Sequence, residues 1–161
     1  MQTKWIATET LAFYEAYFSN FIEGTEFAVR EAEEIIFEGK IPNARPADAH
    51  DVLGTYQIVA STQEMQKPPK NAHDFLKLSK QRHATIMAKR PEKLAGEFKL
   101  EGNRAGSTLF VVPELVEGTL KKGFELYQSL DAPFHRAVFM MFLVAEVHPF
   151  ADGIAIPFIF A

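Results

Sequence analysis

The sequence predicts a single all-α domain that carries one small β-hairpin. Most of the chain consists of segments with apolar residues at helical spacing, and glycine or proline separates one segment from the next. Residues 96–112 break this pattern, because three glycines interrupt short runs there and the last run favours a strand. A length of 161 residues fits one domain, and 47% apolar residues are enough to build a core.

The N-terminal quarter of the chain predicts two helices. The first covers residues 11–22 and is apolar on every side. Its helically spaced apolar residues are Leu11, Tyr14, Phe18 and Phe21. The second covers residues 27–38, with its acidic residues crowded on one face, and Gly39 followed by Pro42 marks its end.

Two further helices are predicted before the hairpin. Asp48 can cap the first of them, and the Pro-Pro pair at positions 68–69 ends it. The apolar stripe of this helix consists of Val52, Tyr56 and Val59. Asn71 can cap the next helix, residues 72–89, which stops before Pro91.

The hairpin and two helices complete the prediction. Residues 96–112 form a hairpin or flap, and the β-prone run within it is 108–112. Pro113 fits the first turn of a fifth helix that runs to about Leu130. A sixth helix, residues 134–147, is apolar nearly all round, so we expect it to be central.

Charge and composition exclude several classes of function. Residues 1–66 hold four basic and eleven acidic residues, whereas residues 67–104 hold ten basic and four acidic ones. The basic region attracts anions or is simply a solvated helix face, and no base-reading motif accompanies it, so we expect no nucleic-acid binding. The chain has no cysteine, which excludes disulfides, thiol catalysis and thiolate metal sites.

The sequence favours a cytoplasmic protein with no membrane partner. Residues 1–9 lack the charge and apolar pattern of a signal peptide. The longest apolar run, residues 137–145, would give a helix of about 14 Å, about half of a bilayer core. Four histidines show no metal-ligand spacing and are interpreted as surface or core residues, namely His50, His73, His83 and His135.

One hexapeptide, His-Pro-Phe-Ala-Asp-Gly at residues 148–153, carries the most specific signal. It resembles the first half of the Fic-family active-site motif, His-Pro-Phe-x-Asp-Gly-Asn-Gly-Arg-x-x-Arg. Residues 19–24, Ser-Asn-Phe-Ile-Glu-Gly, resemble the inhibitory motif of the Fic class with an N-terminal inhibitory helix. Residues 106–120 resemble the flap and the helix after it, and residues 134–147 resemble the helix that leads into the motif.

The order of these landmarks makes the chain resemble a Fic-type (Fido) domain over most of its length. On this basis residues 1–161 form a single Fic-like domain. Its parts are an N-terminal inhibitory segment at 1–40, a flap at 96–112, and a helix with its motif loop at 134–153.

The resemblance implies AMPylation, the transfer of AMP from ATP with Mg²⁺ to a Ser, Thr or Tyr hydroxyl of a target protein. His148 would be the general base, and Asp152 would hold Mg²⁺ against the donor phosphates. On the ATP-binding side, Gly153 would let backbone N–H groups face phosphate, and Phe150 would anchor the loop by burying its ring. Taken alone, His148 also fits an ordinary capping histidine, and Asp152 a turn residue before glycine.

The resemblance also assigns roles outside the motif. Glu23 would be the autoinhibitory residue, with Ser19 one helical turn before it and Gly24 after it. A plain helix end at Gly24 is the alternative. The flap would bind the target in extended form through main-chain hydrogen bonds, and a structural hairpin edge is the alternative. The flap residues concerned are Thr108, Leu109, Phe110 and Val111.

The second half of the family motif is absent from the sequence. The substituted positions, where the family has Asn, Gly, Arg and Arg, are Ile154, Ala155, Ile156 and Ile159. No Arg or Lys follows Arg136, so the phosphate clamp is lost and Glu23 lacks its usual arginine partner. Since each charged hydrogen bond to phosphate contributes about 1.5–3 kcal/mol, we expect most transfer activity to be lost.

The family places further helices after its motif, so the sequence predicts a C-terminally truncated version of that fold. Its apolar helix faces would then lack a packing neighbour. Three interpretations stay open: an adenylyltransferase restrained by its N-terminal helix, a catalytically inactive Fic-like binding module, and an inactive remnant that forms a homodimer through the apolar residues 154–161.

Overall fold

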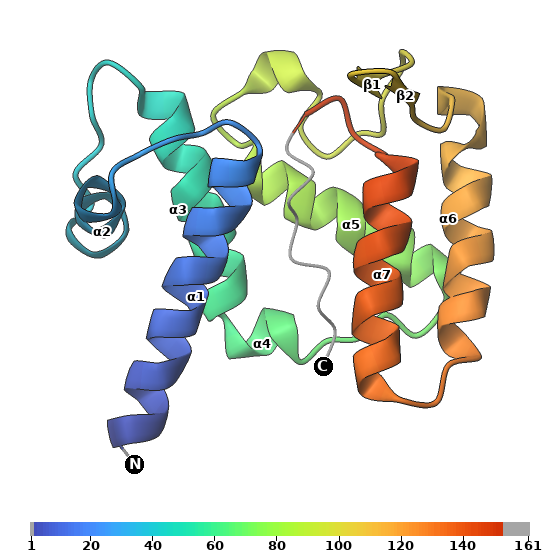
Figure 1. Cartoon of the computed structure of the whole chain (residues 1–161), viewed down its shortest axis with the longest axis horizontal. Coiled ribbons are helices and arrows are strands. Elements are labelled where there is room, and N and C mark those ends of the chain that lie inside the picture. Colours follow the sequence, from blue (N-terminus) through green and yellow to red (C-terminus); the bar gives the residue numbers. More distant parts are fainter. Residues whose placement is uncertain (1, 153–161) are drawn as a thin grey trace.

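A computed structural model of the chain describes residues 2–152, with side chains for residues 9–90 and 92–152. The helices and strands are α1 (Gln2–Ile22), α2 (Val29–Glu38), α3 (Pro46–Ala60), α4 (Thr62–Met65), α5 (Ala72–Ile86), the 3₁₀ turn η1 (Pro91–Lys93), β1 (Arg104–Ala105), β2 (Thr108–Leu109), α6 (Pro113–Gln128) and α7 (Pro133–Val147). Figure 1 shows a helical domain whose small sheet is the antiparallel β1–β2 hairpin. The predicted all-α fold with a hairpin is therefore confirmed.

The predicted helix boundaries need correction in the first half of the chain. The first helix begins at Gln2 rather than at residue 11. The third helix stops at Ala60, because Ser61 accepts a hydrogen bond from the Glu64 amide and starts the separate helix α4. Asp48 is not a cap, since it lies inside the first turn of α3 and pairs with arginine instead.

Two predicted helix starts are confirmed. The Asn71 side chain accepts a hydrogen bond from the Asp74 amide at 2.9 Å, so it caps α5 as expected. Pro113 occupies the first turn of α6, where its missing N–H costs nothing.

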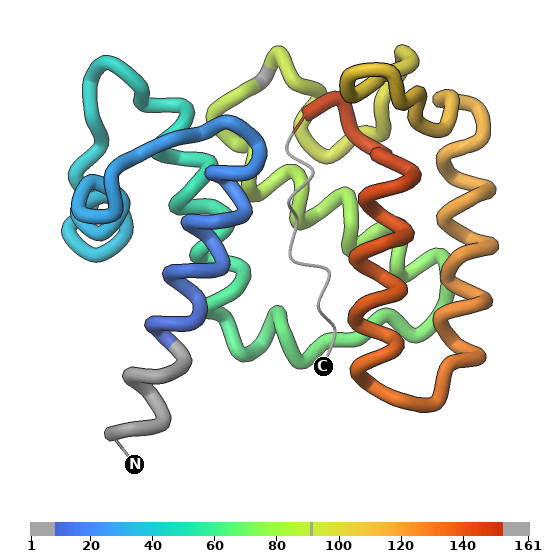
Figure 2. The backbone as a smooth tube through the Cα atoms, in the orientation of Figure 1, coloured from blue at the N-terminus to red at the C-terminus, as the bar shows by residue number. Residues whose placement is uncertain are grey.

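The helices form two packed groups that α5 joins. In the first group α1 lies along α3, and α2 packs against both. Its buried apolar cluster consists of Phe13, Phe27, Ala32, Ile35, Ile36, Ala49 and Val52. In the second group α6 packs against both α5 and α7, and α6 and α7 run antiparallel (Figure 2). Its larger cluster includes Phe75, Leu120, Phe124, Met140, Val147 and Phe150.

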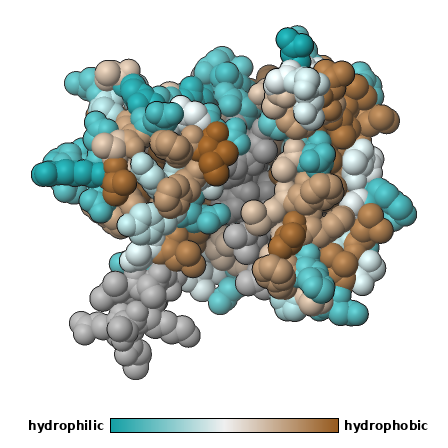
Figure 3. Space-filling view, viewed as in Figure 1, coloured by the Kyte–Doolittle hydropathy of each residue, from teal (hydrophilic) through white to brown (hydrophobic). Residues whose placement is uncertain are grey.

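Helix α7 is less central than its composition predicts. One side of it is buried against α6, but four of its large apolar side chains are exposed, namely Phe134, Val138, Met141 and Phe142. Helix α1 likewise exposes Leu11, Tyr14, Phe18, Phe21 and Ile22. Apolar side chains therefore reach the surface on both sides of the face in Figure 3. None of the helices within residues 2–152 is long and apolar enough to cross a membrane.

Candidate active site

The motif loop begins at an unusual backbone position. Helix α7 ends at Val147, and His148 is its C-cap with φ of 48°, in the left-handed region that non-glycine residues seldom adopt. The His148 amide donates to the Val144 carbonyl at 2.9 Å. This turn directs the chain away from α7 and toward α5 and the flap.

The flap covers the imidazole of His148. The Phe110 ring stacks on it, with ring centroids 4.0 Å apart and an angle of 14° between the planes. Burial lowers the pKa of His148 to about 4, the nearby Lys99 ammonium adds to this, and Asp152 opposes it. His148 is therefore a neutral imidazole at physiological pH.

Two residues of the flap, Lys99 and Asn103, bind carbonyl groups of the motif loop. The Lys99 amide donates to the Pro149 carbonyl at 2.9 Å, and the Lys99 ammonium lies 3.3 Å from the Val147 carbonyl. Asn103 donates to the Phe150 carbonyl at 3.0 Å and accepts from the Lys99 ammonium at 2.6 Å. Lys99 is buried, and burial lowers its pKa. Its charge stabilises the C-terminal end of α7, where carbonyls lack helical partners.

Phe150 is fully buried, so its ring anchors the loop. It stacks on His83, with centroids 3.9 Å apart and an angle of 5° between the rings, and contacts Phe98 at 5.4 Å. Sequence reasoning treats His83 as an ordinary core or surface histidine and misses this contact. A signal exists, because helical spacing from Phe75 and Ser79 puts residue 83 on the buried face of α5.

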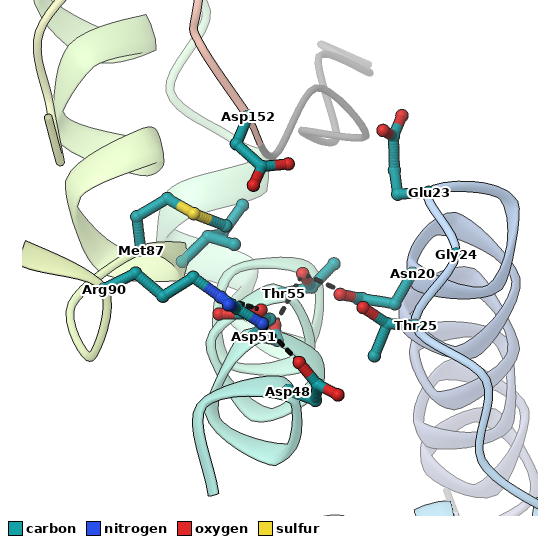
Figure 4. A pocket seen from close by; sticks show the side chains of 11 residues that line it. Asn20, Glu23, Gly24, Thr25, Asp48, Asp51, Thr55, Met87, Arg90 and Asp152 are labelled. Carbon is teal, nitrogen blue, oxygen red and sulfur yellow. Dashed lines mark hydrogen bonds and ion pairs between the residues drawn. The ribbon is translucent and has the colours of Figure 1, made fainter. Parts of the chain in front are cut away.

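Asp152 and Glu23 approach the same cavity from opposite sides (Figure 4). The cavity has a volume of about 150 Å³ and is lined by Asn20, Glu23, Gly24, Thr25, Asp48, Asp51, Thr55, Ile86, Met87, Arg90 and Asp152. Burial raises the pKa of Glu23, and the negative charge of Asp152 adds to the shift. Asp152 also forms an ion pair with Lys93 at 2.9 Å.

An ion-pair network forms the wall of this cavity below Glu23. Arg90 donates to Asp51 at 2.7 Å and also to Asp48, which Arg45 holds at 2.7 Å. Burial raises the pKa of Asp51 to about 6 in spite of Arg90. Three members of the network lie within seven residues of each other, but Arg90 joins them from 39 and 42 positions away, so nothing in the sequence singles out the complete network.

The segment at the end of α1 that the sequence predicts to be inhibitory lies at the cavity as well. Gly24 has φ of 88° and ends α1. Ser19 does not line the cavity, but the buried Asn20 beside it does, and it donates to Thr55 on α3 at 3.1 Å. Among the side chains of residues 9–90 and 92–152, Glu23 makes no ion pair with Lys, Arg or His.

The other candidate residues are placed as follows. Thr108 and Leu109 form β2, and the side chain of Leu109 is largely exposed. Val111 packs against the larger apolar cluster. Gly153 lies outside the described residues. The structure thus brings His148 to the flap and Asp152 to Glu23.

A magnesium ion would have one carboxylate ligand here. Among residues 2–152, no group of three or more potential ligand side chains can hold a metal ion. Asp152 is 42% exposed at the cavity edge, however, and Mg²⁺ binds through one carboxylate when substrate phosphates and waters complete its shell. A magnesium ion at Asp152 would therefore need oxygen ligands from another molecule and from water to complete its shell.

Comparison with known proteins identifies the fold. The sequence matches no known protein-family model and no curated protein. A Fic domain containing signalling protein from Bacteroides thetaiotaomicron superposes with a TM-score of 0.77 at 18% identity, over 96% of this chain and 60% of the other. Fic-1 from C. elegans gives 0.65 at 20% identity, over 89% and 44%. A Fic family protein from Desulfovibrio desulfuricans gives 0.69 at 14% identity, over 91% and 45%.

The chain therefore has the fold of Fic-domain proteins. It covers 60%, 44% and 45% of the length of these three structures. The fold predicted from the landmarks in the sequence is confirmed at this level.

Proposed function

We propose that this chain is a Fic-type adenylyltransferase domain, which transfers AMP from ATP to a Ser, Thr or Tyr hydroxyl of a target protein and is restrained by α1. One observation carries the proposal. On a Fic-type fold, a single loop presents a neutral imidazole, His148, beneath the flap and a carboxylate, Asp152, at a cavity that Glu23 also faces.

In the proposed reaction, the hydroxyl oxygen of the target attacks the α-phosphorus of ATP. The bond from that phosphorus to the oxygen bridging the β-phosphate breaks, and pyrophosphate leaves. The hydroxyl proton goes to His148, which the loop keeps neutral and able to accept it. A pKa of about 4 makes His148 a weak base, so the proton transfer has little driving force while the flap covers the ring.

The donor phosphates would lie against the face of the motif loop that is opposite the Pro149 and Phe150 carbonyls, which accept hydrogen bonds from the flap. The amide N–H groups of Phe150 and Ala151 donate to no acceptor among residues 2–152, whereas the Pro149 and Phe150 carbonyls are both occupied. Asp152 would hold Mg²⁺ after releasing Lys93. Bound Mg²⁺ would neutralise charge on the phosphate oxygens.

Glu23 would restrain this site by charge. It lies at the cavity edge near Asp152 and adds a second carboxylate where donor phosphates would approach. The apolar residues Ile154, Ile156 and Ile159 supply no compensating positive charge. Because loss of a charged transition-state clamp costs about 10³-fold or more in rate, transfer by this chain should be slow.

Label transfer tests the proposal directly. The wild type, Glu23→Gly, and Glu23→Gly combined with His148→Ala are incubated with α-labelled ATP and Mg²⁺ in a cell extract that supplies targets. We expect weak or no transfer by the wild type, measurable transfer by Glu23→Gly, and loss of that transfer in the double variant. Absence of label with both the wild type and Glu23→Gly contradicts the proposal.

A catalytically inactive binding module is the second candidate. The isoleucines at 154, 156 and 159 favour it, because they replace the phosphate-binding half of the motif. Calorimetry separates the two candidates. An inactive module should give no binding heat at millimolar Mg²⁺-ATP, whereas an impaired enzyme should still bind the donor weakly.

A further inference from the structure

His83 is buried between two loops that are far apart in the sequence. Its exposure is 0%, and it projects from α5 toward the first residue of the flap, Gly96, on one side and the motif loop on the other. The Gly96 amide lies 2.9 Å from its Nδ1, and the Asp152 carbonyl lies 2.9 Å from its Nε2. Both nitrogens of one buried ring are therefore in use.

These two contacts require one form of the imidazole. An amide N–H can only donate, so Nδ1 must present its lone pair to Gly96. A carbonyl oxygen can only accept, so Nε2 must carry the proton that it donates to Asp152. The neutral ring with its proton on Nε2 satisfies both groups, and the other neutral tautomer satisfies neither.

The surroundings leave the ring little freedom to move. His83 stacks on Phe150 with an interplanar angle of 5°. On the opposite loop, Gly96 has φ of 81°, and a Cβ at that position would meet the Ala84 Cβ at 3.0 Å. Gly96 thus approaches α5 closely enough for its amide to reach the ring.

We infer that His83 is a positioning residue for the motif loop. Its Nε2–H tautomer holds the Asp152 carbonyl, and through the loop backbone it sets where the Asp152 carboxylate meets the cavity. The Phe150 ring, which stacks on His83, restricts the part of the loop that lies nearer to His148. This role in loop geometry does not depend on enzymatic activity. Only the effect of His83 on AMP transfer rests on the proposed function.

The wild-type protein provides the first test. Nitrogen-15 NMR of the side chain measures which imidazole nitrogen carries the proton. We expect His83 to show a protonated Nε2 and an unprotonated Nδ1 at neutral pH. A protonated Nδ1, or a mixture of tautomers, overturns the inference and requires no variant.

Two matched substitutions separate the two hydrogen bonds. His83→Gln keeps a donor near the Nε2 position, and His83→Asn keeps an acceptor near the Nδ1 position. Hydrogen exchange at the Lys99 amide monitors the motif loop, because this amide donates to the Pro149 carbonyl, and exchange at the Gly96 amide monitors the other bond.

We expect His83→Asn to speed exchange at Lys99 by about tenfold while Gly96 stays protected, since a lost hydrogen bond of about 1.4 kcal/mol gives that factor. His83→Gln should show the reverse pattern. Equal effects of both substitutions on both amides would indicate a merely structural role and overturn the inference. Circular dichroism checks that each variant folds. If a variant does not fold, the tautomer measurement on the wild-type protein tests the inference instead.

The transfer assay links the loop to function. In the Glu23→Gly background, His83→Asn should lower transfer by about 10²-fold and His83→Gln by much less, because a displacement of about 1 Å costs about 10²-fold. Equal transfer by the two variants contradicts the positioning role. No transfer by Glu23→Gly itself contradicts the proposed function, and the NMR and exchange results then decide the role of His83 on their own.

Discussion

The Phe110 ring lies nearly parallel to the His148 imidazole, with centroids 4.0 Å apart. This contact removes water from one face of the histidine, and burial is the largest cause of its low pKa. We therefore expect Phe110→Ala to raise the pKa of His148 from about 4 toward its ordinary value of 6.5. An NMR titration of the imidazole measures the shift. Leu109→Ala is the matched control, since that side chain is 79% exposed, and it should leave the titration unchanged.

The same pKa makes stability depend on pH. In the unfolded chain His148 binds a proton below about 6.5, but in the folded state only below about 4, so the unfolded state binds more protons between these values. Stability from this residue is thus present above pH 6.5 and is lost as the pH falls toward 4. We expect the wild type to lose stability relative to His148→Asn over this window, as measured by urea unfolding at several pH values. Asparagine is chosen because it tolerates the left-handed backbone.

The comparison with His148→Asn matters because Asp51 acts in the opposite direction. Its pKa is raised to about 6, so its contribution to stability is present below pH 3.8 and is lost as the pH rises through 6. A pH scan of the wild type alone mixes these effects. A wild-type-minus-variant difference that stays flat from pH 7.5 to 4.5 would show that His148 is not shielded from protonation.

The ion pairs of Arg90 should contribute more to the free energy of unfolding than an exposed ion pair does. Arg90 donates to Asp51, which is 4% exposed, and to Asp48. Removing one partner from a buried pair costs about 3–5 kcal/mol, and because Arg90 itself is 20% exposed we expect Arg90→Leu to cost about 3 kcal/mol. Urea unfolding measures this value.

Two controls identify the cause of that loss. Adding Asp51→Asn to Arg90→Leu should recover part of the stability, because no unpaired carboxylate then stays buried. Lys122→Ala removes an exposed pair with Glu125 and should change stability by at most about 1 kcal/mol. An Arg90→Leu effect as small as that of Lys122→Ala would show that solvent already screens the network.

The elements of this fold can be predicted from the sequence because their signals are local. Asn71 and Pro113 mark helix starts through contacts within one turn, and both predictions are confirmed. The predicted start of α3 at Asp48 is wrong, since a good capping residue can serve an ion pair instead. The exposed face of α7 could not be predicted from the sequence. An apolar side chain shows that a position can be buried, but it does not show whether another element packs over it.

The site can be predicted only where a motif carries it. The hexapeptide indicates His148 and Asp152, but it does not indicate the partners that fix them. His83 reaches Asp152 across 69 positions of the chain, and Lys99 reaches Val147 across 48. Such partners become visible only once the helices have packed, because a single lysine or histidine carries no local mark of its tertiary contact.

Helices α3 and α5 cross closely at Gly54, so a larger residue there should change both the stability of the protein and the ion pair at the cavity wall. A Cβ on Gly54 would lie 3.0 Å from both the Cα of Ile86 and the carbonyl oxygen of Thr85. Both are backbone atoms that cannot rotate away, so Gly54→Ala should force the helices apart. Overpacking costs about 1–3 kcal/mol, and because both contacts are to backbone we expect a cost near the top of this range, which exceeds the helix-propensity gain of about 0.5–1 kcal/mol from replacing glycine.

Gly118→Ala on α6 is the matched control for this substitution. A Cβ there meets nothing within 4 Å, so the propensity gain of about 0.5–1 kcal/mol should appear alone and raise the midpoint of urea unfolding. The two alanine variants should therefore change stability in opposite directions. Because α3 carries Asp51 and Arg90 follows α5, separating these helices should also lengthen the ion pair that walls the cavity. If Gly54→Ala proves as stabilising as Gly118→Ala, α3 and α5 do not approach each other this closely at Gly54.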